Sequence, residues 1–271
     1  MTKTVLITGA SSGFGAATAK LFQQMGWNVI ATMRAPEKEQ ELRALPRILL
    51  FRLDLEDKAS IRAAVDKGVE TFGSIDVLVN NAGYGAIGAL EAASDEVIQQ
   101  QFAVNFFGLI DVMKAVLPMM RKKRSGIVIN LSSMGGRITI PFGSLYHATK
   151  WALEGLTESL QYELNPLGIR LKLIEPGSYQ TNFNGRSLNF FGAGDQPDYQ
   201  DSFARFTVMA KQPGRGNPDL SEVSTAIYQA ATDETDQLRY IVGNDARTLI
   251  QTKQDKGDAA FKELITGHFG L

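Results

Sequence analysis

Short apolar runs rich in β-branched residues alternate with longer segments of helical spacing along almost the whole chain. The runs predict strands at Val5–Thr8, Asn28–Met33, Ile48–Leu53, Ile75–Asn80, Gly126–Leu131, Arg170–Glu175 and Tyr240–Val242. Helical spacing predicts helices at Ala16–Met25, Ala59–Phe72, Asp95–Leu117 and Ser144–Leu164. Strands that alternate with helices over short links are typical of a parallel sheet covered by helices on both faces.

Several predicted strands are apolar without interruption, such as Val77–Val79 and Ile127–Leu131, so both of their faces should be covered. No Pro/Ser-rich linker, repeat or low-complexity tract divides the 271 residues. We therefore expect one α/β domain over residues 1–271. It should be a Rossmann-type, doubly wound fold, with a mostly parallel sheet of about seven strands flanked by helices on both faces.

Residues 182–216 interrupt this alternation. The segment places aromatic residues among Gly, Asn, Asp and Pro: Phe183, Phe190, Phe191, Tyr199, Phe203 and Phe206. A long irregular segment inside a compact domain is usually functional. We predict that 182–216 forms a lid over an apolar substrate; packing in a core and an oligomer contact are the alternatives.

Composition excludes several classes of function. The chain has no Cys and only two His, which argues against thiol catalysis, disulfides and a metal site, so none is predicted. Its net charge of −1 argues against a nucleic-acid partner. The N-terminal run Val5–Ile7 is too short for a signal peptide, and no apolar stretch approaches the length of a membrane span. We expect a cytoplasmic protein without a membrane partner.

A glycine-rich turn follows the first predicted strand. Its glycines are Gly9, Gly13 and Gly15, and the residues between them include Ser11, Ser12 and Phe14. In open α/β sheets such a turn, followed by a helix N-terminus, binds the pyrophosphate of a dinucleotide. A Gly-rich turn without a ligand is the alternative.

The end of the second strand indicates which dinucleotide binds. An acidic residue there would hold the ribose 2′-hydroxyl of NAD, but the sequence reads Met33-Arg34. Because a guanidinium suits a phosphate, we predict a 2′-phosphate and hence NADP(H), unless Arg34 is an ordinary surface residue. Asp54, followed by Leu55 at the end of the third strand, should contact the adenine; a strand-end cap is equally compatible with Asp54.

These and later motifs resemble the short-chain dehydrogenase/reductase family over about Met1–Thr181. Beside the glycine turn, the similar segments are Asn80-Asn81-Ala82-Gly83, Asn105, Ser133, Tyr146-x-x-x-Lys150 and Pro176-Gly177 with Thr181. The stretch Tyr146–Trp151 and the long C-terminal part are most similar to the branch that acts on steroids, retinoids and other bulky carbonyls.

Tyr146 and Lys150 are four positions apart on a predicted helix and therefore share one face. An ammonium group lowers the pKa of a neighbouring phenol, so Tyr146 should act as general acid in reduction and general base in oxidation. The Ser133 hydroxyl should stabilise the developing alkoxide. Ser132 is an alternative to Ser133, which the family spacing favours, and either hydroxyl could instead cap a strand end.

The resemblance implies the remaining roles. Lys150 would donate to the nicotinamide ribose, and Asn105 would bind a water that relays protons, with a satisfied core Asn as the alternative. The adenine ribose would be approached by Asn81, Ala82 and Gly83, and the nicotinamide pocket would be lined by Pro176, Gly177, Ser178 and Thr181. His147 should be structural, since it points away from Tyr146.

We therefore predict an NADPH-dependent carbonyl reductase, or the reverse alcohol dehydrogenase, whose partner is a small-molecule apolar carbonyl or alcohol substrate. An NADP(H)-sensing regulator without turnover is the alternative, although it would not need Ser133, Tyr146 and Lys150 together. A methyltransferase would explain the glycines but not the Tyr-Lys pair. Leu109–Leu117 and Trp151–Leu164 could pair two copies into a homo-oligomer, and burial within the monomer fits them equally well.

Overall fold

A computed structural model describes residues 2–181, 187–212, 214 and 216–271. Its main sheet has seven strands in the order β3-β2-β1-β4-β6-β7-β9, all paired in parallel. The strands are β1 (Thr4–Thr8), β2 (Asn28–Met33), β3 (Ile48–Arg52), β4 (Val77–Asn80), β6 (Gly126–Leu131), β7 (Ile169–Pro176) and β9 (Arg239–Val242). The predicted α/β fold is confirmed, and its sheet is parallel throughout.

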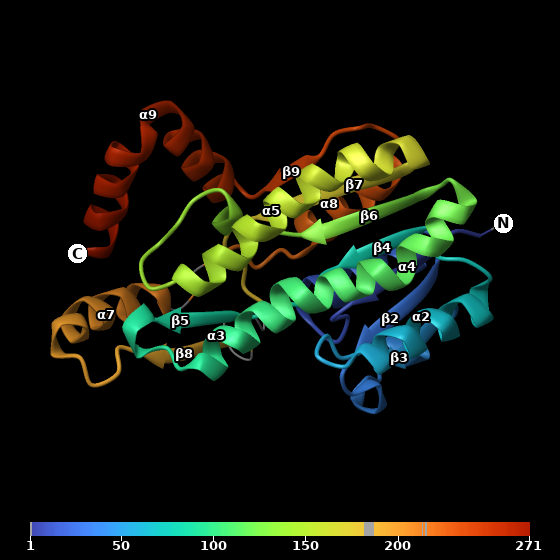
Figure 1. Cartoon of the computed structure of the whole chain (residues 1–271), viewed down its shortest axis with the longest axis horizontal. Helices are drawn as coiled ribbons and strands as arrows, with labels where there is room; N and C mark the ends of the chain where they lie inside the picture. Colours follow the sequence, from blue (N-terminus) through green and yellow to red (C-terminus); the bar gives the residue numbers. More distant parts are fainter. Residues whose placement is uncertain (1, 182–186, 213, 215) are drawn as a thin grey trace.

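Helices cover both faces of this sheet (Figure 1). On one face, α1 (Gly13–Gln24) and α8 (Ser221–Thr232) enclose a core around Val5, Ile7 and Ile227. On the other face, a second core around Leu6, Leu78 and Val112 is enclosed by α2 (Lys58–Phe72), α4 (Leu109–Lys123) and α5 (Ser144–Leu164). Neighbouring residues of β1 thus point into opposite cores, as the continuous apolar run predicts.

The long helix after β4 differs from its prediction in two ways. It runs from α3 (Asp95–Phe102) through a π-helical turn at Ala103–Gly108 into α4, and it continues past Pro118 to Lys123. By length and composition Asp95–Lys123 meets the requirement for a membrane span, contrary to expectation. In this fold its apolar face packs on the sheet, where Val112, Val116 and Met120 are fully buried.

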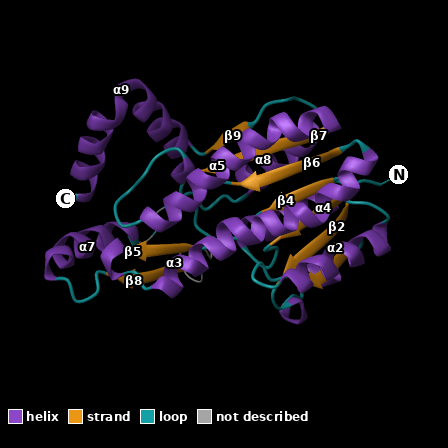
Figure 2. Cartoon of the chain, in the orientation of Figure 1, coloured by secondary structure: helices purple, strands orange, loops and turns teal. Residues whose placement is uncertain are grey.

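The chain around residues 187–212 is more regular than expected. Strand β8 (Leu188–Gly192) pairs in parallel with β5 (Gly85–Gly88) in a separate two-stranded sheet, and α7 (Pro197–Ala210) follows it. The C-terminal helix α9 (Asn244–Phe269) bends at Gly257 and returns toward α7 (Figure 1). These elements lie beyond the carboxyl end of β6, whose arrow points toward them (Figure 2).

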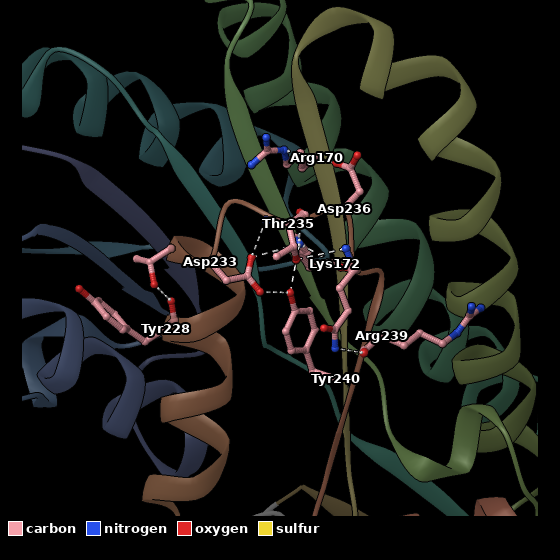
Figure 3. Close-up of polar contacts among 10 residues, drawn as sticks. Arg170, Lys172, Tyr228, Asp233, Thr235, Asp236, Arg239 and Tyr240 are labelled. Carbon is pink, nitrogen blue, oxygen red and sulfur yellow. Dashed lines mark hydrogen bonds and ion pairs between the residues drawn. The ribbon is translucent and has the colours of Figure 1, made fainter.

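A buried lysine of the sheet is hydrogen-bonded to the connection between α8 and β9. Lys172 of β7 is 1 % exposed, and its Nζ donates to the backbone carbonyls of Thr235 (2.6 Å) and Gln237 (2.9 Å). The same Nζ lies 3.1 Å from the Tyr240 hydroxyl and 3.5 Å from an Asp233 carboxylate oxygen (Figure 3). This cluster gives the buried ammonium the partners that it requires.

Candidate active site

One large cavity, about 2080 Å³, lies at the carboxyl ends of the main-sheet strands. It starts at the turn after β1, passes the ends of β6 and β7, and reaches β5, β8, α7 and α9. The chain leaves β1 toward β2 on one side and later resumes at β4 on the other, so the turn lies at a topological switch point, where such folds bind ligands.

Glycine is required at both ends of the turn after β1. Gly9 has a φ of +69°, and a Cβ on it would lie 2.9 Å from the Ala82 Cα. A Cβ on Gly15 would lie 2.3 Å from the Gly9 carbonyl oxygen. The first helical turn is therefore packed against the strand turn, and Gly9, Ser11, Ser12, Gly13 and Phe14 line the cavity.

The side-chain amide nitrogen of Asn81 is hydrogen-bonded to this turn and does not point into the cavity. Its Nδ2 donates to the backbone carbonyls of Thr8 (2.8 Å) and Gly9 (3.1 Å). The Thr8 hydroxyl in turn accepts from the backbone N–H groups of Asn81 and Ala82, each at 3.0 Å. Asn81, Ala82 and Gly83 also line the cavity, where they were expected.

The predicted adenosine end contains Arg34, Asp54 and Leu55, all of which line the cavity. The Arg34 side chain is exposed and makes no ion pair within the described chain. Asp54 accepts a hydrogen bond from the backbone N–H of Glu56 at 3.2 Å, and its other oxygen lies 3.9 Å from Arg52. The Asp54 side chain thus organises the strand end while it faces the cavity.

Ser133, Tyr146 and Lys150 come together at the end of β6. The Ser133 hydroxyl is hydrogen-bonded to the Tyr146 phenol. The Lys150 Nζ lies 5.8 Å from the centroid of the Tyr146 ring and donates to the Leu131 carbonyl at 2.7 Å. The Ser133 Oγ also accepts from the Gly135 N–H at 3.0 Å, so it caps the turn after the strand as well. Ser133, not Ser132, is the serine beside the phenol.

Burial shifts the pKa values of Tyr146 and Lys150. Burial raises the pKa of Tyr146, and the Ser133 hydrogen bond offsets this only partly. Burial also lowers the pKa of Lys150 to about 8, against the opposing effect of Glu154. The predicted lowering of the Tyr146 pKa is therefore wrong: this pKa is raised, because desolvation by burial outweighs the Ser133 hydrogen bond.

The Asn105 side chain is fully engaged with the protein. Its Oδ1 accepts from the Tyr84 N–H at 3.0 Å, and its Nδ2 donates to the Tyr84 carbonyl at 2.7 Å and to the Thr149 hydroxyl at 3.2 Å. These bonds fix the loop after β4 against α5. Asn105 is thus hydrogen-bonded inside the fold, and its role with a relay water stays a prediction.

The segment after β7 is hydrogen-bonded to the carboxylate of Asp245, a residue that was not predicted from the sequence. Pro176, Gly177, Ser178 and Thr181 line the cavity. The Asp245 Oδ2, in the first turn of α9, accepts from the Ser178 N–H at 2.7 Å, and a Cβ on Gly177 would meet the same carboxylate at 2.0 Å. Asp245 carries no local motif and is 67 positions from Ser178, so only the fold identifies it.

The far wall of the cavity is largely apolar. It is formed by side chains of the β5–β8 sheet, the loop after β6, α7 and α9, namely Ile87, Ile138, Ile140, Leu188, Phe190, Phe206, Leu249, Ile250, Leu264, Ile265 and Phe269.

The aromatic residues predicted to form a lid have different environments. Phe206 is 2 % exposed and packs against the rings of Phe142 and Phe269 at 5.4 and 5.3 Å, as a core residue does. Phe190 lines the cavity, whereas the exposed hydroxyl of Tyr199 is bonded to Glu91 at 3.1 Å. Phe183 lies outside the described residues.

His147 has a structural environment, as predicted. Its Nδ1 lies 2.8 Å from the Gly135 carbonyl, and its Nε2 accepts from the Ile140 N–H at 3.0 Å. Burial lowers the pKa of His147 and favours the neutral ring that can accept this bond. His147 therefore fixes the loop that carries Ser133.

Comparison with known families matches residues 3–189 to the short chain dehydrogenase family. This chain belongs to that family. A curated relative, 3-ketodihydrosphingosine reductase of Bacteroides thetaiotaomicron, is 38 % identical over 240 residues, which cover 88 % of this chain and 87 % of the relative. The short-chain dehydrogenases are oxidoreductases of carbonyl and alcohol groups, which agrees with the serine, tyrosine and lysine at the end of β6.

Solved structures of the family share this fold. A short-chain dehydrogenase from Streptomyces avermitilis superposes with a TM-score of 0.83 at 34 % identity, over 94 % of this chain and 93 % of that one. The structure titled ElxO with NADP bound superposes with a TM-score of 0.75 at 27 % identity, over 92 % and 100 % of the two chains. These neighbours support a nicotinamide cofactor for this protein.

The residues present fit such a cofactor. The turn at Gly9–Gly15 lines the cavity with Gly9, Ser11, Ser12, Gly13 and Phe14, and it ends at the N-terminus of α1, which favours a phosphate. From there the cavity continues to Tyr146 and Lys150. A dinucleotide would thus extend from an anion site at α1 to the proton-donating groups at β6.

Proposed function

We propose that this chain is an NADPH-dependent reductase of apolar ketones or aldehydes, able to run in reverse as an alcohol dehydrogenase. The observation that carries the proposal is the position of Ser133, Tyr146 and Lys150. They lie where the cofactor end of the cavity meets its apolar end. A carbonyl between them would have a proton donor at its oxygen and an apolar wall around its substituents.

Tyr146, Ser133 and Lys150 have different roles in the proposed reaction. The bound nicotinamide supplies hydride in reduction and accepts it in oxidation. Tyr146 donates its phenolic proton to the carbonyl oxygen, and the raised pKa keeps that proton on Tyr146 at neutral pH. Ser133 donates to the same oxygen and stabilises the negative charge that develops on it. Lys150, which lines the cavity beside Tyr146, would hold the nicotinamide ribose with its ammonium group.

The choice of NADPH over NADH rests on Arg34. This guanidinium follows β2 directly, is exposed and faces the cavity. No carboxylate occupies the end of β2, where one would hold a free ribose 2′-hydroxyl. A phosphate on the ribose would pair with Arg34 by charge-assisted hydrogen bonds.

The apolar wall supports a bulky substrate with hydrocarbon substituents. Eleven apolar side chains surround the cavity beyond Tyr146 and offer few hydrogen bonds to a sugar or a short polar acid. A relative whose name makes it a ketone reductase of a sphingoid base supports the same class. The proposed substrate class is therefore bulky carbonyl compounds.

NADPH oxidation, followed by absorbance over a panel of ketones and aldehydes of increasing chain length, tests the proposal. We expect turnover that rises with hydrocarbon length and then levels off. A protein that binds NADPH but turns over none of the panel would instead be an NADP(H)-sensing regulator, and the reductase proposal would fail. Short hydroxylated carbonyls serve as the matched control and should react poorly.

A further inference from the structure

Two buried glutamates lie behind the catalytic lysine. Glu154 is one helical turn after Lys150 on α5, and Glu175 is on β7 just before the Pro176 turn. They are 5 % and 0 % exposed. The Arg239 guanidinium lies between them: its Nε donates to the Glu154 Oε2 at 3.0 Å and forms an ion pair with the Glu175 Oε1 at 3.2 Å. One guanidinium is therefore shared by two buried carboxylates.

The charged groups around the pair come from three elements. Beside Glu154, α5 supplies Lys150 and Glu158. The loop after β6 supplies Arg137, whose NH1 lies 3.2 Å from the same Glu175 oxygen, Oε1. From β9, Arg239 also reaches the exposed Glu158 at 2.6 Å. Arg239 thus contacts the Oε2 of Glu154 and the Oε1 of Glu175, and Arg137 contacts only the Oε1 of Glu175.

The second oxygen of each glutamate has no hydrogen-bond partner within the described chain. These atoms are the Glu154 Oε1 and the Glu175 Oε2, and the buried Ser132 Oγ shares this property. A Cβ placed on Gly136 would lie 2.8 Å from the Ser132 Oγ and 3.2 Å from the Glu154 Oε1. The Ser132 and Glu154 oxygens therefore both border the space next to the Gly136 Cα. A buried, ionised oxygen without a donor is costly.

We propose that Glu154 and Glu175 hold one proton between them near neutral pH, and that this pair sets the charge beside Lys150. Protonation turns one unpartnered oxygen into a donor and removes the repulsion between two carboxylates that share one guanidinium. Burial and the nearby Glu154 raise the pKa of Glu175 to about 7, in agreement. Loss of the proton adds a negative charge to the pair as the pH rises.

The pair acts on the active site through Glu154, whose charge raises the pKa of Lys150 against the effect of burial. We therefore infer that Glu154 is a positioning residue that keeps the Lys150 ammonium charged. Only this second step rests on the proposed function, because the shared proton itself requires no turnover.

Infrared spectroscopy of the cofactor-free protein with 13C-labelled glutamate tests the shared proton directly. We expect a protonated carboxyl band at pH 6.5 that disappears as the pH rises through about 7. The band should be absent at pH 6.5 in Glu175→Gln, and in Glu154→Gln it should be weaker at pH 6.5 and disappear at lower pH than in the parent, because one of the two causes of the raised pKa of Glu175 is removed. The band should remain in the matched control Glu158→Gln, which removes an exposed partner of the same Arg239. Absence of the band in the parent, or its persistence in both buried-site variants, would overturn the proposal.

Unfolding provides a second readout for the same proton. The pKa of Glu175 is raised on folding, so the folded state binds the proton more tightly and the stability contributed by this group falls between about pH 4.5 and about pH 7. We expect the melting temperature of the parent to fall more from pH 5 to pH 7.5 than that of folded Glu175→Gln. Equal changes in the two proteins would contradict the proposal.

The link to Lys150 is tested by the pH profile of ketone reduction. Glu154→Gln removes the charge that favours the ammonium, so the decline of activity at high pH should begin at least about half a unit lower than in the parent. A purely structural loss would lower the rate equally at every pH and would contradict this role. If no carbonyl is turned over, the proposed function fails while the infrared result still decides the shared proton.

Discussion

The Lys150 Nζ lies 5.8 Å from the centroid of the Tyr146 ring, one turn away on α5, and both groups border the same cavity. The same nitrogen donates to the last carbonyl of β6. The helix and the sheet thus fix the ammonium between them, beside the phenol. This relationship makes the sequence pattern Tyr-x-x-x-Lys a site for proton transfer rather than a pair on a helix surface.

The pKa of Lys150 predicts how NADPH binding depends on pH. Because burial lowers this pKa to about 8, the ammonium is present at pH 7 and is lost as the pH rises through about 8. NADPH affinity, measured by its fluorescence, should therefore fall several-fold between pH 7 and pH 9. Lys150→Met should bind more weakly at pH 7 and lose this pH dependence. A parent protein with constant affinity over this range would contradict the role of Lys150.

Arg34 is expected to set the cofactor preference. Arg34→Leu should reduce the ratio of kcat/KM for NADPH to that for NADH by about tenfold to a hundredfold, since a charge-assisted contact contributes roughly 1.5–3 kcal/mol. Arg62→Leu, which removes an exposed arginine outside the cavity lining, is the matched control and should leave the ratio unchanged. A parent that prefers NADH would contradict this assignment.

Asp245 should matter for cofactor binding although it lies far along the chain. Its carboxylate accepts the Ser178 N–H at 2.7 Å and so holds the backbone that lines the nicotinamide end of the cavity. Asp245→Ala should raise the KM for NADPH about tenfold, in line with the loss of a charged hydrogen bond. Asp255→Ala, an exposed position on the same helix, should have no such effect; equal effects of both substitutions would refute the prediction.

The buried Lys172 is expected to stabilise the fold (Figure 3). Lys172→Met removes the donor to the carbonyls of Thr235 and Gln237, and it should lower the free energy of unfolding by about 2–4 kcal/mol in urea titrations. Arg170→Met, on the same strand, removes only a partly exposed pair with Asp236 and should cost less than about 1 kcal/mol. Similar losses in both variants would show that Lys172 has no special role.

The sequence predicted the features that depend on local pattern. Continuous apolar runs predict buried parallel strands, and the contact that excludes a Cβ at Gly15, the Gly9 carbonyl oxygen, lies within the same turn. The pair Tyr146 and Lys150 follows from helical periodicity, which requires no knowledge of the remaining fold.

Features that depend on distant contacts were missed. Gly85–Gly88 has two glycines and only one β-branched residue, so nothing local predicts that it pairs with Leu188–Gly192. Asp245 has a function only because α9 returns to β7. The pKa of Tyr146 was predicted in the wrong direction because burial is a property of the whole fold, whereas the neighbouring lysine is visible in the sequence.

Substitution of one oxygen atom tests the central claim most directly. Tyr146→Phe keeps the ring and removes the proton, so NADPH should still bind with nearly the parent affinity while ketone reduction slows by about 10²–10⁴-fold. Single-turnover reduction of the best panel substrate, with NADPH binding measured on the same preparation, gives both numbers. A variant that reduces the ketone as fast as the parent would contradict the assignment of Tyr146 as the proton donor.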